Sequence, residues 1–434
     1  MKKCKTIAAF TAAVLICGII SGCSKDKAEE NTAAAETTAE VMSETVQAEA
    51  EIPPLDISQV PDYDSAKFGS VSLDTAFVQL GNTSRLREKL DKMKNGEEVT
   101  VGFIGGSITE GISAGAEDCY AKLTYNFLAE RYGTGDNVKY VNAGLSGTPS
   151  ILGNLRLDRD ILSQGADIIF VEFAVNDGGD KLYQESFDSL VQTALTAENQ
   201  PAVILLFNRT KDGHTTQEYM QKIGEHYDLP MISSAAALTE ALDNGSITWA
   251  DYSDDSSHPN YDGHKLVAAM LESLFIRLEA STAVDGEYTV KEGLHGAPYK
   301  NALMAERGYD NSDPRLDITD EGSFAAEAGY TAGFTGGWKY DGTGSEPMKM
   351  KVTGNSLFLV CKRNNNADMG KFEVYINGNR AKIIDTNDKD GWGDPFAYQV
   401  IKWQSSKEMD VEIKIAEGSE QKCVEILAIG VSDD

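Results

Sequence analysis

Three residues of this 434-residue chain have neighbours that could make them reactive. Ser107 follows two glycines, which let the backbone turn sharply and expose the hydroxyl, and Asp255 and His258 lie three residues apart. A serine hydroxyl is a weak nucleophile near neutral pH, so a base must take its proton. An imidazole can act as that base, and a carboxylate on its other ring nitrogen fixes the tautomer. These residue types predict nucleophilic attack on an acyl group.

Acyl transfer also requires fixed hydrogen-bond donors for the negative charge that develops on the carbonyl oxygen. Two further segments could supply them: Asn142–Thr148, which contains Gly147, and Phe173–Gly178, which contains Asn176. The donors would be the backbone N–H groups of Ser107 and Gly147 and the side-chain amide of Asn176. Each segment alone is an ordinary turn signal, so the prediction depends on all of them meeting in space.

The segments with Ser107, Gly147 and Asn176 each follow an apolar run that is typical of a strand covered on both faces. Amphipathic stretches separate these runs, and the last of them covers Gly263–Leu278. The alternation predicts an α/β fold with a doubly wound parallel sheet over residues 65–280. Ligands of such sheets bind beyond the carboxyl ends of the strands, so the three segments should meet there. The expected strands are Val99–Ile104, Val138–Ala143, Asp167–Ala174, Ala202–Phe207 and Pro230–Ile232.

Taken in this order, the four segments resemble those of the SGNH (GDSL-type) hydrolase family. The resemblance covers residues 65–280 and implies a flavodoxin-like sheet and a serine esterase that uses no cofactor and no metal. It implies that Ser107, Asp255 and His258 form the catalytic triad, and that Ser107, Gly147 and Asn176 form the oxyanion hole. The first segment reads Gly-Gly-Ser where the founding members have Gly-Asp-Ser, a variant familiar in carbohydrate-acting branches.

The same residues leave alternatives open. Asp254 or Asp251 could orient His258 in place of Asp255. His264 with Asp262 could cap the last helix. His258, His264 and Asp255 could instead suggest a metal site, although the serine and asparagine segments would then have no role. The glycines before the serine could cradle a phosphate, but neither of the usual phosphate-loop patterns is present.

The alternation of strands and helices ends after residue 280. Residues 281–325 have little periodicity and are predicted to be a connector, whereas residues 326–434 alternate as in a β-sandwich. Three of the four tryptophans lie in this last segment, where they could stack on sugars, or two could fill the core while one lies at the rim. They are Trp338, Trp392 and Trp403.

The first 22 residues resemble a lipoprotein signal peptide. Three lysines precede an apolar run that is short for a bilayer span, and small residues precede Cys23 as in the bacterial lipobox. The resemblance implies lipidation at Cys23, an extracytoplasmic location and an anchor in the cell membrane. Residues 23–64 are rich in Ala, Thr and Glu and poor in large apolar side chains, which predicts a disordered acidic tether.

The composition narrows the choice of partner. The chain has 39 Lys and Arg against 68 Asp and Glu, for a net charge of -29, so nucleic acid is not an expected partner. We therefore expect an extracytoplasmic serine esterase that removes O-acetyl groups from a polysaccharide. The alternatives are an acyltransferase or lipid-directed acylhydrolase with the same triad, and a non-catalytic carbohydrate-binding lipoprotein.

Overall fold

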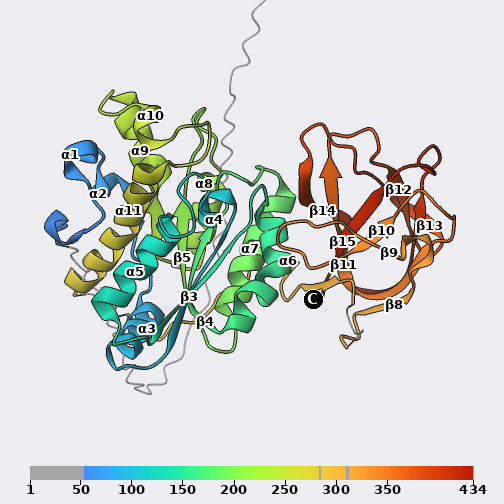
Figure 1. Ribbon diagram of the computed structural model, residues 1–434. Helices are drawn as coiled ribbons and strands as arrows, with labels where there is room; N and C mark the ends of the chain where they lie inside the picture. The colour runs from blue at the N-terminus through green and yellow to red at the C-terminus, as the bar shows by residue number, and fades with distance from the viewer. Residues whose placement is uncertain (1–52, 283–284, 309–311, 434) are drawn as a thin grey trace, which may run out of the picture. The chain divides into compact units, whose positions relative to one another are not determined.

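The computed structural model describes residues 53–282, 285–308 and 312–433, which form an α/β domain and a C-terminal β domain within one compact unit (Figure 1). The predicted signal peptide, Cys23 and most of the predicted tether lie outside the described residues. No helix within those three ranges is both long enough and apolar enough to cross a bilayer.

The α/β domain is built on a six-stranded sheet in the order β1-β6-β5-β4-β2-β3. Five strands are parallel, as predicted, and their bounds differ from the expected ones by at most two residues. The sixth, β1, is a three-residue antiparallel edge strand that the sequence did not reveal, because it is too short to show alternation. The strands are β1 Phe77–Gln79, β2 Val99–Gly105, β3 Val138–Gly144, β4 Ala166–Glu172, β5 Ala202–Phe207 and β6 Met231–Ser233.

Helices cover both faces of this sheet (Figure 1). Apolar side chains of α3, α5, α9 and α11 share one core with the sheet, and those of α6, α7 and α8 share the other. Side-chain oxygens cap the starts of two long helices, since Asp180 accepts from backbone N–H groups of α7 and Asn260 from one of α11. The helices are α1 Ser65–Phe68, α2 Leu73–Ala76, α3 Ser84–Lys94, α4 Ser107–Glu110, α5 Tyr120–Tyr132, α6 Ser150–Asp160, α7 Lys181–Leu195, α8 Gln217–His226, α9 Ser234–Asp243, α10 Trp249–Tyr252 and α11 Tyr261–Ala280.

The folded part begins earlier than residue 65, where the predicted tether was expected to end. Val60 is only 4% exposed, and the Tyr63 hydroxyl donates to the carbonyl oxygens of Phe68 and Val71 at 2.7 and 2.9 Å. The end of the predicted tether therefore packs against the α/β domain. Val60 belongs to the core of this domain, and Leu55 and Tyr63 pack against it, although the preceding segment is acidic and rich in small residues.

The C-terminal domain is an antiparallel sheet of eight strands, with the main order β10-β15-β11-β14-β12-β13. β-Bulges interrupt the pairing of its two longest strands, β11 and β14, so each continues through a local irregularity. Two further strands, β7 and β8, lie inside the predicted connector 281–325 and pair with β15 and β11, so that prediction was too long. The strands of this sheet are β7 Leu303–Glu306, β8 Leu316–Asp320, β10 Trp338–Tyr340, β11 Met348–Asn364, β12 Lys371–Ile376, β13 Asn379–Asp385, β14 Trp392–Ile415 and β15 Val424–Ser432. The two-residue strand β9 Ala326–Glu327 lies outside it.

The β domain packs on α6 and α7 of the α/β domain. Leu155 of α6 shares an apolar cluster with Phe358 and Leu427, all of them buried. Lys402 forms an ion pair of 2.6 Å with the buried carboxylate of Glu185 on α7. This interface fixes the β domain beside the loop between β3 and α6, which carries Gly147.

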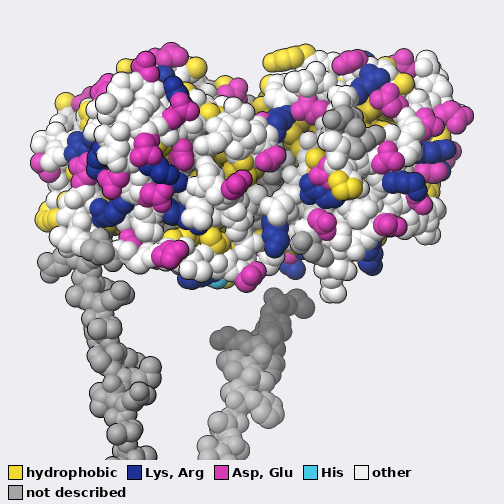
Figure 2. All heavy atoms as spheres, turned by 90° about the horizontal axis from the view of Figure 1, so that it is seen from below, with side chains coloured by type: hydrophobic (Ala, Val, Ile, Leu, Met, Phe, Trp, Pro, Cys, Tyr) yellow, Lys and Arg dark blue, Asp and Glu magenta, His cyan; other side chains and the backbone are white. Residues whose placement is uncertain are grey.

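Charged side chains of both signs are interspersed on the face of the molecule shown in Figure 2. The excess negative charge is therefore spread over this face, which presents no large patch of Lys and Arg. A surface of this kind has little attraction for a polyanion.

Candidate active site

The sheet brings the predicted segments to one edge. Ser107 is the first residue of α4, directly after β2, and its residue surface is 8% exposed. Gly147 lies in the loop after β3, and Asn176 lies in the loop after β4. All three follow the carboxyl ends of neighbouring parallel strands, as the sequence predicted.

Ser107, His258 and Asp255 form a continuous hydrogen-bonded chain. The Ser107 Oγ lies 2.9 Å from His258 Nε2, and His258 Nδ1 lies 2.7 Å from Asp255 Oδ2. Asp255 is therefore the carboxylate on the ring, and the alternative Asp251 instead accepts hydrogen bonds from Thr248 at the start of α10. The arrangement can pass the serine proton to the imidazole while the carboxylate holds the other ring nitrogen.

The loop that carries the histidine keeps Asp255 ionised. Partial burial acts to raise the pKa of this carboxyl, but hydrogen bonds from the backbone N–H groups of His258 and Ser257 and from the His258 ring outweigh it and lower the pKa to about 2. Both backbone N–H groups donate to Asp255 Oδ1 at 2.7 Å. The Trp249 indole N–H donates to the Asp255 backbone carbonyl at 2.6 Å, which also fixes the backbone of this loop.

Two of the candidate oxyanion donors lie on segments that contact residues close to the serine in sequence. The Asn176 amide lies against Gly106, since a Cβ on that glycine would be 2.2 Å from Asn176 Oδ1. In this chain, a larger residue before Ser107 would therefore have to displace the amide. Gly147 has φ +71°, in the left-handed region that favours glycine.

A buried carboxylate fixes the position of the asparagine loop. Asp177 Oδ1 accepts from the Ser150 backbone N–H at 2.7 Å, and Asp177 Oδ2 accepts from the Tyr219 hydroxyl at 2.8 Å. Burial raises the pKa of Asp177 to about 7. The loop with Asn176 is thereby tied to the start of α6, directly after the loop with Gly147.

Glu110 joins the nucleophile helix to the Gly147 loop, a role that the sequence analysis missed. Its Oε2 accepts from the backbone N–H of Ser146 at 2.8 Å and also from the Ser146 hydroxyl. A carboxylate three residues after the serine, within the same helical turn, is the signal that could have suggested it.

His264 hydrogen-bonds to the backbone of Tyr120 and Ile112 rather than to the triad residues. Its Nδ1 accepts from the Tyr120 backbone N–H at 3.1 Å, so its Nε2 carries the proton and donates to the Ile112 carbonyl at 3.2 Å. Burial lowers the pKa of His264 to about 4, which keeps the ring neutral. The predicted alternative of a helix cap was wrong, because the Asn260 side chain caps α11. In the part of the chain that the structure describes, no three His, Cys, Asp or Glu side chains could hold a metal ion.

An exposed tryptophan of the β domain covers the Gly147 loop. A Cβ on Gly147 would lie 3.1 Å from Trp392 Cζ2, and Trp392 is 61% exposed. The Trp392 backbone N–H donates to Asp394 Oδ1 at 3.0 Å, and Arg363 Nε donates to Asp394 Oδ2 at 2.8 Å. A fully buried carboxylate thus fixes the backbone that carries the indole.

The other two tryptophans of the β domain have different surroundings. Trp338 is almost completely buried in the core of the β domain, and Trp403 packs partly against that core with Lys407 over its ring. Trp392 alone of the three contacts the candidate site. Trp392 begins β14, and the glycines on either side of it, Gly391 and Gly393, were a visible signal that its ring is displayed.

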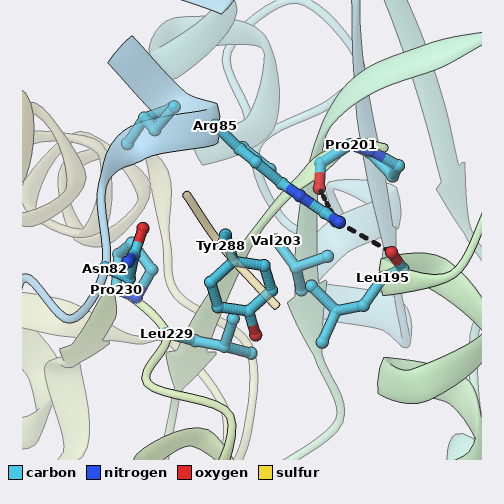
Figure 3. A pocket seen from close by; sticks show the side chains of 10 residues that line it. Asn82, Arg85, Leu195, Pro201, Val203, Leu229, Pro230 and Tyr288 are labelled. Carbon is cyan, nitrogen blue, oxygen red and sulfur yellow. Dashed lines mark hydrogen bonds between the residues drawn. The ribbon is translucent and has the colours of Figure 1, made fainter. Parts of the chain in front are cut away.

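A second cleft, shown in Figure 3, lies where the parallel strands begin, at the end of the sheet opposite the candidate site. It lies at the amino ends of β5 and β6, where Arg85 and Tyr288 approach Val203 and Pro230. Its cavity of about 10 Å³ has room for roughly one water molecule. It contains none of the predicted site residues and is too small for a substrate.

Residues 103–266 match the model of the GDSL-like Lipase/Acylhydrolase family. The α/β domain belongs to this family. The matched segment contains all five residues predicted for the triad and the oxyanion hole. We call the α/β domain the acylhydrolase domain from here on. The resemblance inferred from the four segments is therefore confirmed.

Solved structures resemble both domains of the chain. A crystal structure of a two-domain esterase (CEX) active on acetylated mannans, co-crystallized with mannopentaose, covers 84% of this chain and 98% of its own, with 24% identity and a TM-score of 0.72. A second crystal structure of a two-domain esterase (CEX) active on acetylated mannans covers 84% and 99%, with 23% identity and a TM-score of 0.72. These likenesses confirm that the acylhydrolase domain followed by a β domain is a known architecture.

A further solved structure overlaps a smaller part of the chain. The acetylxylan esterase Axe2 from Geobacillus stearothermophilus covers 42% of this chain and 96% of its own, with 20% identity and a TM-score of 0.34. No curated protein matches the chain.

Proposed function

We propose that the protein is a carbohydrate acetylesterase that uses Ser107, His258 and Asp255 as its catalytic triad. The observation that carries the proposal is the 2.9 Å contact between Ser107 Oγ and His258 Nε2, with Asp255 on the other ring nitrogen. The serine attacks the acetyl carbonyl, and the imidazole takes its proton and then gives it to the leaving sugar oxygen. Water activated by the same imidazole then releases acetate and frees the serine.

The preference for a glycan is supported by Trp392. Aromatic faces bind the apolar faces of sugar rings, and this ring is exposed next to the loop that would receive the acetyl carbonyl. A sugar stacked on the indole would place its acetyl group close to Gly147. The two-domain esterases active on acetylated mannans share both domains of this architecture, which makes acetylated mannan the first substrate to test.

We expect Trp392→Ala to lower kcat/KM for acetylated mannan about 10-fold, the value of one aromatic contact of about 1.4 kcal/mol. The kcat/KM for 4-nitrophenyl acetate should change less than about twofold, because this small ester does not need the ring platform. Both values of kcat/KM come from one set of assays. Acetate release is measured on acetylated mannan, xylan, pectin and peptidoglycan, and 4-nitrophenol release is measured on 4-nitrophenyl acetate and octanoate.

Two variants serve as controls for this experiment. Trp392→Phe keeps a smaller aromatic face and should recover part of the loss, and Trp403→Ala removes a tryptophan of the same domain that does not contact Gly147. Equal losses on polymer and small ester would mean that Trp392 only shapes the oxyanion loop. Turnover of 4-nitrophenyl octanoate as fast as that of 4-nitrophenyl acetate would contradict the acetylesterase itself.

We also propose that Cys23 is lipidated and anchors the protein outside the cytoplasm. The apolar run and small residues before Cys23 support this, as does the place where the chain enters the folded domain. Pro53 and Leu55 lie beside Ile276 and Ala280 at the end of α11, whereas His258 precedes its start. A helix of 20 residues spans about 30 Å, so the tether joins the domain far from the catalytic loop. An anchored enzyme would thus keep its active site accessible to a polymer.

Cys23→Ser is expected to move the protein from the membrane to the soluble fraction of a bacterial host and to abolish labelling with radioactive palmitate. Two or three acyl chains supply enough apolar area to hold a protein on a bilayer, and the serine variant cannot carry them. The alternative is an ordinary signal peptide without lipidation. In that case, wild type and Cys23→Ser would both be unlabelled and would both be recovered in the soluble fraction.

A further inference from the structure

A buried arginine lies beneath the two loops that carry Ser107 and Gly147. Arg156 is on α6, its side chain is 1% exposed, and the proposed chemistry does not use it. One nitrogen, Nη1, donates to the Ala143 carbonyl at 2.6 Å and to Asp160 Oδ2 at 3.0 Å. The other, Nη2, donates to the Gly105 carbonyl at 3.0 Å.

The two carbonyls belong to the ends of neighbouring strands. Gly105 ends β2, two residues before Ser107, and Ala143 lies at the end of β3, four residues before Gly147. The Gly105 carbonyl also accepts from the Leu145 backbone N–H at 3.1 Å. A single planar guanidinium therefore connects the peptide groups from which both candidate oxyanion loops depart.

We propose that Arg156 is a positioning residue for the oxyanion hole, acting through these two carbonyls on the backbone donors of Ser107 and Gly147. The proposal rests on the proposed esterase function. Oxyanion donors stabilise a transition state only if they are fixed before charge develops, and a misplacement of about 1 Å can cost about 100-fold in rate. Burial lowers the pKa of the Arg156 guanidinium and Asp160 opposes this shift, and because arginine stays charged in folded proteins its positive charge lies next to the Gly105 and Ala143 carbonyls.

Carboxylates close to Arg156 hold its guanidinium in place. Asp160 accepts from Arg156 on the side away from the strand ends, and it is itself paired with Arg159 at 2.5 Å. Glu110, which binds the Gly147 loop directly, adds a favourable electrostatic interaction with Arg156. The segment with Gly147 is thus fixed by the Glu110 carboxylate at Ser146 and by Arg156 at the Ala143 carbonyl.

Arg85 offers a matched comparison for a purely structural role. It also ties backbone carbonyls at an edge of the same sheet, since its Nη1 donates to Leu195 at 2.8 Å and to Pro201 at 3.3 Å (Figure 3). Its guanidinium lies over the Tyr288 ring, at the edge opposite the active site. Replacement of either arginine removes two hydrogen bonds to backbone carbonyls, part-buried for Arg85 and buried for Arg156, but only those of Arg156 go to the strand ends before the candidate oxyanion loops.

The test compares Arg156→Met, Arg156→Lys and Arg85→Met, with kcat and KM measured on 4-nitrophenyl acetate and the folded fraction measured by circular dichroism. We expect Arg156→Met to lower kcat about 100-fold per folded molecule, with KM changed less than about threefold. Arg156→Lys keeps the charge but not the planar pair of donors, so about 10-fold is expected. Arg85→Met should leave kcat within about twofold of wild type.

Asp160→Asn keeps the arginine and removes one charge that orients it, so it provides a second variant if Arg156→Met does not fold. A severalfold decrease in kcat at unchanged KM is expected for it. A kcat per folded molecule within about threefold of wild type for Arg156→Lys and Asp160→Asn would overturn the positioning role. An inactive wild-type enzyme would overturn the esterase proposal itself, and these two failures are distinguishable.

Discussion

Ser107→Ala and His258→Ala are each expected to lower kcat for 4-nitrophenyl acetate by at least about 10⁴-fold. The serine variant lacks the nucleophile, and the histidine variant leaves the hydroxyl without the base that lies 2.9 Å away. Binding should survive, because neither change alters the exposed Trp392 surface. Initial rates over a range of ester concentrations, with the protein freed of contaminating esterases, measure the loss.

The double variant sharpens this prediction. Residues that act as one unit do not contribute additively, so Ser107→Ala with His258→Ala should be about as inactive as either single variant. Ser256→Ala, in the same exposed loop, and His226→Ala, on a distant helix, are matched controls that should keep nearly full activity. Appreciable turnover in both single variants would mean that another nucleophile acts.

The α/β sheet was predictable because its central strands are buried on both faces. Each of β2, β4 and β5 is an almost continuous apolar run, which has few other interpretations between helical stretches. The two longest strands of the β domain were not predictable in full. Gln404–Lys407 reads as a polar turn, yet this segment continues β14. Pairing with β11 and the bulge at Gly354 overrode the local signal.

The part of the site that follows from strand order was predictable, and the part made by remote contacts was not. Ser107, Gly147 and Asn176 meet because carboxyl ends of parallel strands share one edge. Arg156 and Trp392 gain their roles only from partners distant in sequence, namely strand-end carbonyls for the arginine and a loop of the other domain for the tryptophan. No local pattern of residue types specifies such partners before the chain has folded.

The amide of Asn176 is the candidate oxyanion donor that can be removed without changing the backbone. We expect Asn176→Ala to lower kcat for 4-nitrophenyl acetate by about 10²- to 10³-fold with little change in KM, because the lost hydrogen bond strengthens only as charge develops. Asn176→Asp should lose at least as much, since a carboxylate would repel the oxyanion. Circular dichroism and thermal unfolding establish that each variant is folded.

The contact between Asn176 and Gly106 provides an independent way to disturb the same donor. A Cβ at Gly106 would lie 2.2 Å from Asn176 Oδ1, so Gly106→Ala must push the amide away from the serine. Gly106→Ala should therefore reduce kcat as well, and adding it to Asn176→Ala should cost little more, because the amide is already absent. If the two losses multiplied instead, Gly106 would act on the nucleophile loop itself. If Asn176→Ala alone kept kcat within about threefold of wild type, the amide would have no part in stabilising the oxyanion.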